Sequence, residues 1–149
     1  MILDERTEFA DALTIPTALG RSLLGDDINL LTARNVGSPP RPLYLVIQID
    51  TAVTSAGAAT VSFELVSDAQ SPILTDGTAT QHAKTADFPK ALLVAGFSVA
   101  IPLPGVQPEY EKFLGVISNV GVAVLTAGKA NAFLTHDPKQ WKALPDALA

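Results

Sequence analysis

The stretch from residue 92 to residue 134 constrains the fold most, because it holds three strand-like segments separated by turn residues. In the first segment, apolar side chains recur at every second position, at Phe97, Val99, Ile101 and Leu103. A period of two is typical of a β-strand with one buried face. Proline lacks the N–H that a strand ladder needs, so Pro102 and Pro104-Gly105 predict the end of this segment and the turn that follows it. The pattern indicates a chain that builds a sheet.

Other parts of the chain repeat this strand-like pattern. The predicted strands cover residues 28–31, 43–50, 60–66, 78–85, 96–103, 110–119 and 129–136. About eight short antiparallel strands, with no amphipathic helix in the body, predict an all-β fold of the β-sandwich type. Long crossings such as 51–59 and 104–109 favour jelly-roll wiring over a simple meander. The side chains that we expect between the two sheets are Leu45, Ile47, Phe63, Leu65, Val99 and Ile101, while Thr60, Ser62 and Glu64 should face outward.

The two ends of the chain lack this alternation. Residues 1–20 mix apolar anchors with charges, and we expect them to form an N-terminal arm that becomes ordered against a partner. The competing interpretation is a helix with Ile2, Phe9 and Leu13 on one face. Residues 21–136 are then the jelly-roll domain, and residues 137–149 are a C-terminal tail that packs across its surface.

The composition holds more apolar residues than a soluble domain of this size needs. Hydrophobic residues make up 48% of the 149 residues and charged residues only 17%. Prolines, glycines and polar residues interrupt the uncharged stretches 91–108 and 113–128, so neither resembles a membrane-spanning helix. Acidic residues near the N-terminus argue against an export signal. We therefore assign the apolar surplus to a protein interface and expect no membrane partner.

Charge and reactive side chains exclude further classes of function. The net charge is −5 and no basic stripe is present, which disfavours nucleic-acid binding. The chain has no cysteine, and its two histidines, His82 and His136, stand apart without the HxH cluster of a cupin-type enzyme. Asp26-Asp27 lacks the further oxygen ligands of a calcium site and is expected in a solvated turn. We predict no catalytic, metal or cofactor site and no enzyme activity.

Several short segments, in their order along the chain, resemble a known family. They are Met1–Asp4 with Phe9–Ala12, Pro42–Val46 with Thr60–Leu65, Leu93–Phe97 with Pro102–Pro104, and Leu125–Lys129. Together they resemble the capsid cement (decoration) proteins of short-tailed bacteriophages, of the type described for a Bordetella phage. The resemblance covers most of residues 1–136, and the tail 137–149 has no match in it.

The resemblance implies a structural virion protein that binds the outside of a phage capsid and stabilises contacts between major capsid subunits. Its partners would be the major capsid protein and itself, as a dimer or else a trimer. Its location would be the outer capsid surface, after synthesis in the host cytoplasm. The candidate contact residues in the arm are Ile2, Leu3, Phe9 and Leu13. Two other hypotheses are a carbohydrate- or receptor-binding jelly-roll module of a phage particle and a cupin-like enzyme.

Overall fold

A computed structural model describes residues 4–36, 41–105 and 108–140. These residues form ten strands and two short 3₁₀ helices. The helices are η1 (Glu5–Thr7) and η2 (Pro138–Gln140). The strands are β1 (Glu8–Thr14), β2 (Gly20–Leu23), β3 (Ile28–Asn29), β4 (Tyr44–Thr54), β5 (Thr60–Asp68), β6 (Thr80–Lys84), β7 (Phe88–Pro89), β8 (Ser98–Pro102), β9 (Phe113–Gly121) and β10 (Ala127–Thr135).

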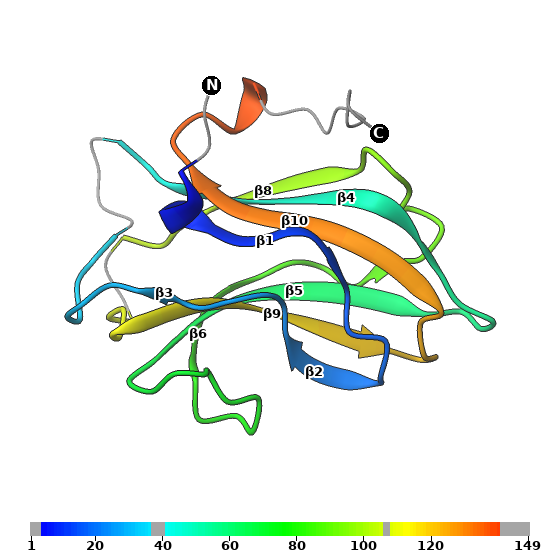
Figure 1. The fold of residues 1–149 in the computed structure, drawn as a ribbon, viewed down its shortest axis with the longest axis horizontal. Coiled ribbons are helices and arrows are strands. Elements are labelled where there is room, and N and C mark those ends of the chain that lie inside the picture. The colour runs from blue at the N-terminus through cyan, green and yellow to red at the C-terminus, as the bar shows by residue number, and fades with distance from the viewer. Residues whose placement is uncertain (1–3, 37–40, 106–107, 141–149) are drawn as a thin grey trace.

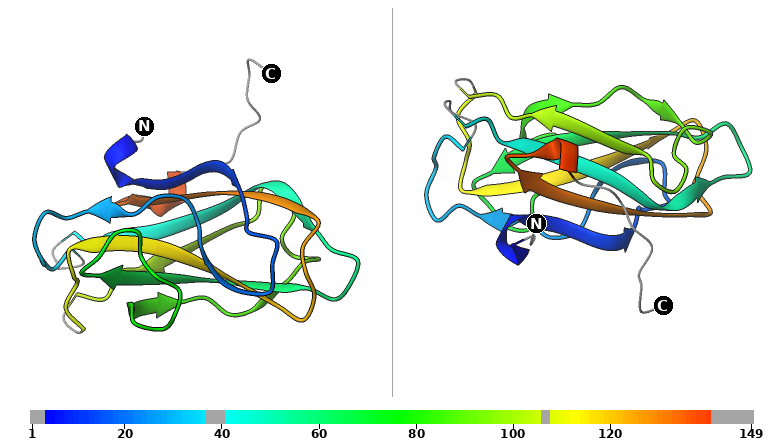
Figure 2. Two further views of the ribbon diagram at one scale, coloured as in Figure 1. Left: turned by 60° about the horizontal axis from the view of Figure 1, so that its bottom comes forward. Right: turned by 90° about the horizontal axis from the view of Figure 1, so that it is seen from above.

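The strands build two antiparallel sheets that stack face to face (Figure 1, Figure 2). One sheet has the order β1-β10-β4-β8, and the other has the order β2-β9-β5-β6. β3 continues β2 along β9, and β7 continues β6 along β5, so the ten strands act as eight. When β2 with β3 and β6 with β7 are each counted as one strand and the eight are numbered along the chain, the order is 1-8-3-6 in the first sheet and 2-7-4-5 in the second. This is jelly-roll wiring, and the predicted all-β jelly-roll sandwich is confirmed.

The core lies between the two sheets, as the alternation of apolar and polar residues predicted. Leu45, Ile47, Phe63 and Leu65 are fully buried, as predicted. Val99 and Ile101 pack against the same core but are only partly buried. Their strand, β8, is at the edge of its sheet and has a neighbour on one side alone. An edge strand leaves part of its inner face uncovered, which explains the difference.

Some strand limits differ from the prediction. The loop expected at 51–59 is shorter, because β4 continues through Thr51–Thr54 and pairs with β10 there. The strand expected at 78–85 is observed as β6, and it lies at the edge of its sheet. Residues 122–126 connect β9 to β10 without forming a strand.

The first strand contradicts the expectation of a separate arm. Residues 8–14 form β1, which pairs with β10 at the edge of the first sheet, and the backbone N–H of Ala12 donates to the side chain of Asn131. Phe9 and Ala10 belong to the main core. Gly25, in a left-handed conformation (φ 74°), lies so close to Phe9 that an added Cβ would fall 1.8 Å from the Phe9 carbonyl oxygen. β1 is therefore part of the sandwich, which begins at residue 8.

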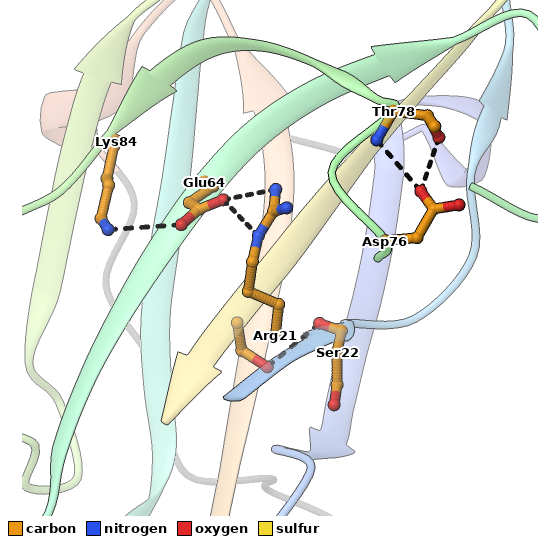
Figure 3. Close-up of polar contacts among 7 residues, drawn as sticks. Arg21, Ser22, Glu64, Asp76, Thr78 and Lys84 are labelled. Atoms are coloured by element: carbon orange, nitrogen blue, oxygen red, sulfur yellow. Dashed lines mark hydrogen bonds and ion pairs between the residues drawn. The ribbon is translucent and has the colours of Figure 1, made fainter. Parts of the chain in front are cut away.

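Glu64 also differs from the simple picture of an outward polar residue. Its side chain lies on the face of β5 that points away from the core between the sheets, but it is only 3% exposed. The carboxylate forms ion pairs with Arg21 on β2 (2.8 Å) and Lys84 on β6 (3.4 Å), and these two side chains cover it (Figure 3). Ser62, another predicted outward residue, is fully buried. An outward-facing position in the middle of this sheet can therefore be buried, as Glu64 and Ser62 are.

A candidate interaction surface at one end of the sandwich

Four connections that lie far apart in the sequence meet at one end of the sandwich, on the right in Figure 1. They are the β1–β2, β4–β5, β7–β8 and β9–β10 connections. Together they carry five of the eight large hydrophobic side chains that are exposed in the described part of the chain. We call this surface the apolar end, formed by Leu19, Leu92, Val94, Val122 and Val124, which are 52–75% exposed.

Hydrogen bonds between the four connections hold the apolar end together. The backbone N–H of Leu125 donates to the Thr17 carbonyl (2.9 Å), and the Ser55 hydroxyl donates to the Val124 carbonyl (2.6 Å). Lys90 donates from Nζ to the Ser55 carbonyl (2.5 Å). These contacts link all four connections into one surface. The apolar side chains are therefore presented by an ordered framework rather than by independent loops.

Val122 has an unfavourable backbone conformation at the tip of the β9–β10 connection. Its φ is 68°, and the N–H of Ala123 donates to the carbonyl of Gly121 (2.8 Å), which closes a three-residue γ-turn. This form of the γ-turn is rare and strained, and a β-branched residue tolerates positive φ poorly. Val122 is nevertheless 75% exposed, so the strain is not offset by burial of its own side chain. Strained residues are enriched at binding sites, although Leu31 has a similar φ (69°) and exposure (72%) at the opposite end.

The apolar end also differs from the opposite end in charge. Its connections, residues 15–19, 55–59, 90–97 and 122–126, contain one charged residue, Lys90. The connections at the other end, residues 30–43, 69–79 and 103–112, contain six: Arg34, Arg41, Asp76, Glu109, Glu111 and Lys112. The ammonium of Lys90 is already hydrogen-bonded within the molecule. A partner at the apolar end would thus meet an almost uncharged surface on an acidic protein.

The predicted contact residues are not gathered in one place. Ile2 and Leu3 lie outside the described residues. Phe9 is 2% exposed in the core, so its proposed contact with a partner is wrong for this fold. Leu13 is 42% exposed near the end of β1, where the chain leads into the apolar end.

An open acidic groove runs beside β1 and β3. Leu13 lines it, together with Glu8, Asp11, Asp26 and Asp27. Partial burial raises the pKa of Glu8, and the neighbouring carboxylates of Asp11 and Glu5 raise it further. The turn expected at Asp26-Asp27 is present, and Asp27 accepts a hydrogen bond from the Ser71 hydroxyl (3.0 Å).

The two histidines remain apart in the fold. His82 is buried on β6, whereas His136 is exposed and contacts the Pro42 carbonyl through Nδ1 (3.1 Å). His82 Nε2 lies 2.7 Å from the hydroxyl of Ser67, but this serine is fully buried, so the hydroxyl is out of a substrate's reach. Among residues 4–36, 41–105 and 108–140, no group of three or more His, Asp or Glu side chains is placed to hold a metal ion.

The aromatic side chains bear on the sugar-binding alternative. Sugar recognition commonly uses exposed rings as stacking platforms, but the eight aromatic residues that the structure describes are all buried or half-buried. Trp141 lies outside the described residues. Tyr110 stacks on His82 inside the molecule with ring centres 4.0 Å apart.

Comparison with known protein families adds one finding. The family model Bbp16 matches residues 10–134. This chain belongs to the Bbp16 family. The family name indicates a Bordetella phage protein, and the matched span runs from inside β1 to the end of the sandwich in β10. The Bbp16 match thus includes all four connections of the apolar end. A search of curated proteins found no match. Among the described residues, no helix is long and apolar enough to cross a membrane.

Sequence reasoning missed the apolar end as a unit. Its members come from positions 19, 92–94 and 122–124, and each looks unremarkable within its own loop. One signal was available, because Leu92, Val94, Val122 and Val124 lie in loop segments almost without charge. The jelly-roll order then brings these loops to the same end of the sandwich.

Proposed function

We propose that this chain is a structural virion protein that binds the outside of a bacteriophage capsid and stabilises contacts between major capsid subunits. We further propose that the apolar end is the surface that docks on the shell. The observation that carries the proposal is the gathering of five exposed apolar side chains on one hydrogen-bonded, almost uncharged surface. The jelly-roll fold and membership in a phage protein family support it.

The energetics fit attachment at many equivalent sites. Full burial of a Val or Leu side chain is worth roughly 1.5–3 kcal/mol. Because the five side chains are already partly covered, each would contribute about 1 kcal/mol on docking. Association itself costs several kcal/mol, so one apolar end gives weak binding. A dimer that presents two such ends would bind more tightly, because once the first end is bound the second is held close to its own site on the shell. We therefore propose a homodimer, with a trimer as the alternative.

The proposal requires no catalytic residue, cofactor or nucleic-acid partner. Its test is co-sedimentation of the purified protein with undecorated shells of the same phage. Val122→Asp combined with Leu92→Asp would place two charges in the docking surface, and we expect this variant to lose shell binding. Burial of unpaired charge is unfavourable, and the loss should be at least tenfold in affinity.

Leu31 offers a matched control at the opposite end. It is 72% exposed with φ 69°, so it is similar to Val122 in size, exposure and backbone conformation. Leu31→Asp should bind shells as the unmodified protein does. If Leu31→Asp loses binding and the Val122 variant keeps it, the docking surface is at the other end. If the unmodified protein does not co-sediment with shells, the capsid function is wrong.

A further inference from the structure

A buried polar cluster joins three segments of the second sheet near one edge. Ser67 is on β5, His82 is on β6, and Tyr110 and Glu111 come just before β9. His82 Nε2 lies 2.7 Å from the Ser67 hydroxyl oxygen, and this oxygen also accepts the backbone N–H of Glu111 (3.0 Å). The His82 ring stacks almost parallel on the Tyr110 ring, at an angle of 16°. We call these four residues the His82 cluster.

The cluster adds support to a strand at the edge of its sheet. β6 pairs with β5 on one side only. The pairing passes from Leu65–Ala83 directly to Val66–Gln81, so His82 is the extra residue of a β-bulge. A bulge disrupts the ladder locally and re-aims the side chain. Contacts to residues 110–111 therefore add to the β5 ladder in holding β6, and they include the hydrogen bond from the Thr80 hydroxyl to the Glu111 carboxylate (2.7 Å).

The surroundings of His82 suit the neutral ring and not the charged one. Nε2 has Ser67 as its partner, but Nδ1 is buried and has no hydrogen-bond partner among the described residues. Protonation would make both nitrogens donors and leave a charged N–H without an acceptor, which is costly in a buried site. Burial lowers the pKa of His82, and the nearby Glu111 carboxylate opposes this shift.

The groups that face the ring are few. From β5 it meets the hydroxyl of Ser67, which is not charged. From the segment before β9, Tyr110 stacks on the His82 ring, and its phenol donates to the Pro104 carbonyl (2.7 Å). The Glu111 carboxylate of the same segment acts on the ring electrostatically. Glu111 is the charged group acting on the ring, and its effect is smaller than that of burial.

We propose that the His82 cluster is an acid-sensitive latch: protonation of His82 opens residues 80–84 and 108–112 while the rest of the sandwich stays folded. At neutral pH the ring is uncharged and the latch is closed. Below the ordinary histidine pKa of about 6.5, the open form takes up a proton that the closed form resists, so the open population rises as pH falls. This inference is independent of the proposed capsid function.

Hydrogen exchange followed by mass spectrometry tests the latch on the full chain between pH 7.5 and pH 5. Exchange rates are corrected for the pH dependence of unprotected amides. We expect the protection of amides in 80–84 and 108–112 to fall by up to about tenfold per pH unit below about 6.5. Amides in the middle of β4 should keep their protection. His82→Phe keeps a ring for stacking on Tyr110 but has no proton to bind, and its protection should not change with pH.

The second histidine gives the control, and a second variant guards against misfolding. His136→Gln removes the exposed histidine and should respond to acid as the unmodified protein does. His82→Gln replaces His82→Phe if the latter fails to fold. An acid response that persists in the His82 variants would overturn the latch. So would an unmodified protein whose protection is constant with pH, or one that loses protection equally in every strand.

Discussion

The Arg21 guanidinium reaches across strand β9 to the Glu64 carboxylate, at 2.8 Å. Arg21 is on β2 and Glu64 on β5, and the two strands are separated by β9 in the sheet. Lys84 approaches the same carboxylate from β6 on the other side (Figure 3). One carboxylate thus ties together the outer strands of the sheet, and its two partners keep it from water.

The two sides of this ion pair should respond differently to mutation. Arg21→Met leaves a buried carboxylate with Lys84 alone, and we expect a loss of about 2–4 kcal/mol in unfolding free energy. Glu64→Gln leaves two cations that can reach water, and it should cost about 1 kcal/mol. Urea denaturation of both variants and of the double variant measures the coupling. Equal losses in the two single variants would contradict this picture.

Relief of strain at Val122 should separate stability from binding. Asparagine tolerates positive φ better than a β-branched residue. Val122→Asn should therefore leave the unfolding free energy unchanged or raise it by about 1 kcal/mol, while it weakens shell binding. Thermal denaturation and co-sedimentation measure the two effects. A variant that is less stable would show that Val122 supports the fold rather than the partner.

Removal of β1 should destabilise the sandwich. A chain lacking residues 1–14 loses the pairing with β10 and the buried Phe9 side chain. Loss of a buried Phe alone costs about 3–5 kcal/mol, so we expect a large drop in Tm or failure to fold. Removal of residues 1–7 keeps β1 and takes away only exposed or half-buried described residues, so Tm should change little. An unchanged Tm in the longer deletion would restore the interpretation of residues 8–14 as an arm.

Alkaline pH should reveal the buried phenol of Tyr110. Burial raises the pKa of Tyr110 to about 12. The unfolded chain loses this proton near pH 10, so the folded state holds a proton that the unfolded state has released between about pH 10 and pH 12. Stability should therefore fall with rising pH in this window, and less so in Tyr110→Phe. In Tyr44→Phe, which leaves Tyr110 as the sole tyrosine, the phenolate absorbance should appear only near pH 12.

The sequence predicted the sheets well where side chains alternate, as in residues 60–66. It failed for β1 because the register shifts twice there and Ala12 has φ 46°, so both Phe9 and Ala10 face the core in succession. No period of two survives such irregularities. It failed for Glu64 because burial depends on Arg21 and Lys84, which are 43 and 20 positions away in the chain. Covering by long side chains from other strands leaves no local signal.

The strand order also limits the order in which the strand pairs can form during synthesis. The pairs β5–β6, β4–β8, β2–β9 and β1–β10 enclose one another like nested hairpins. Pairing can thus begin in the middle of the chain and spread outward, with each step closing a longer loop. β1 leaves the ribosome first but finds its partner last, once residues 127–135 have emerged. The first sheet therefore cannot be completed at its β1 edge, beside Phe9, before β10 has been synthesised.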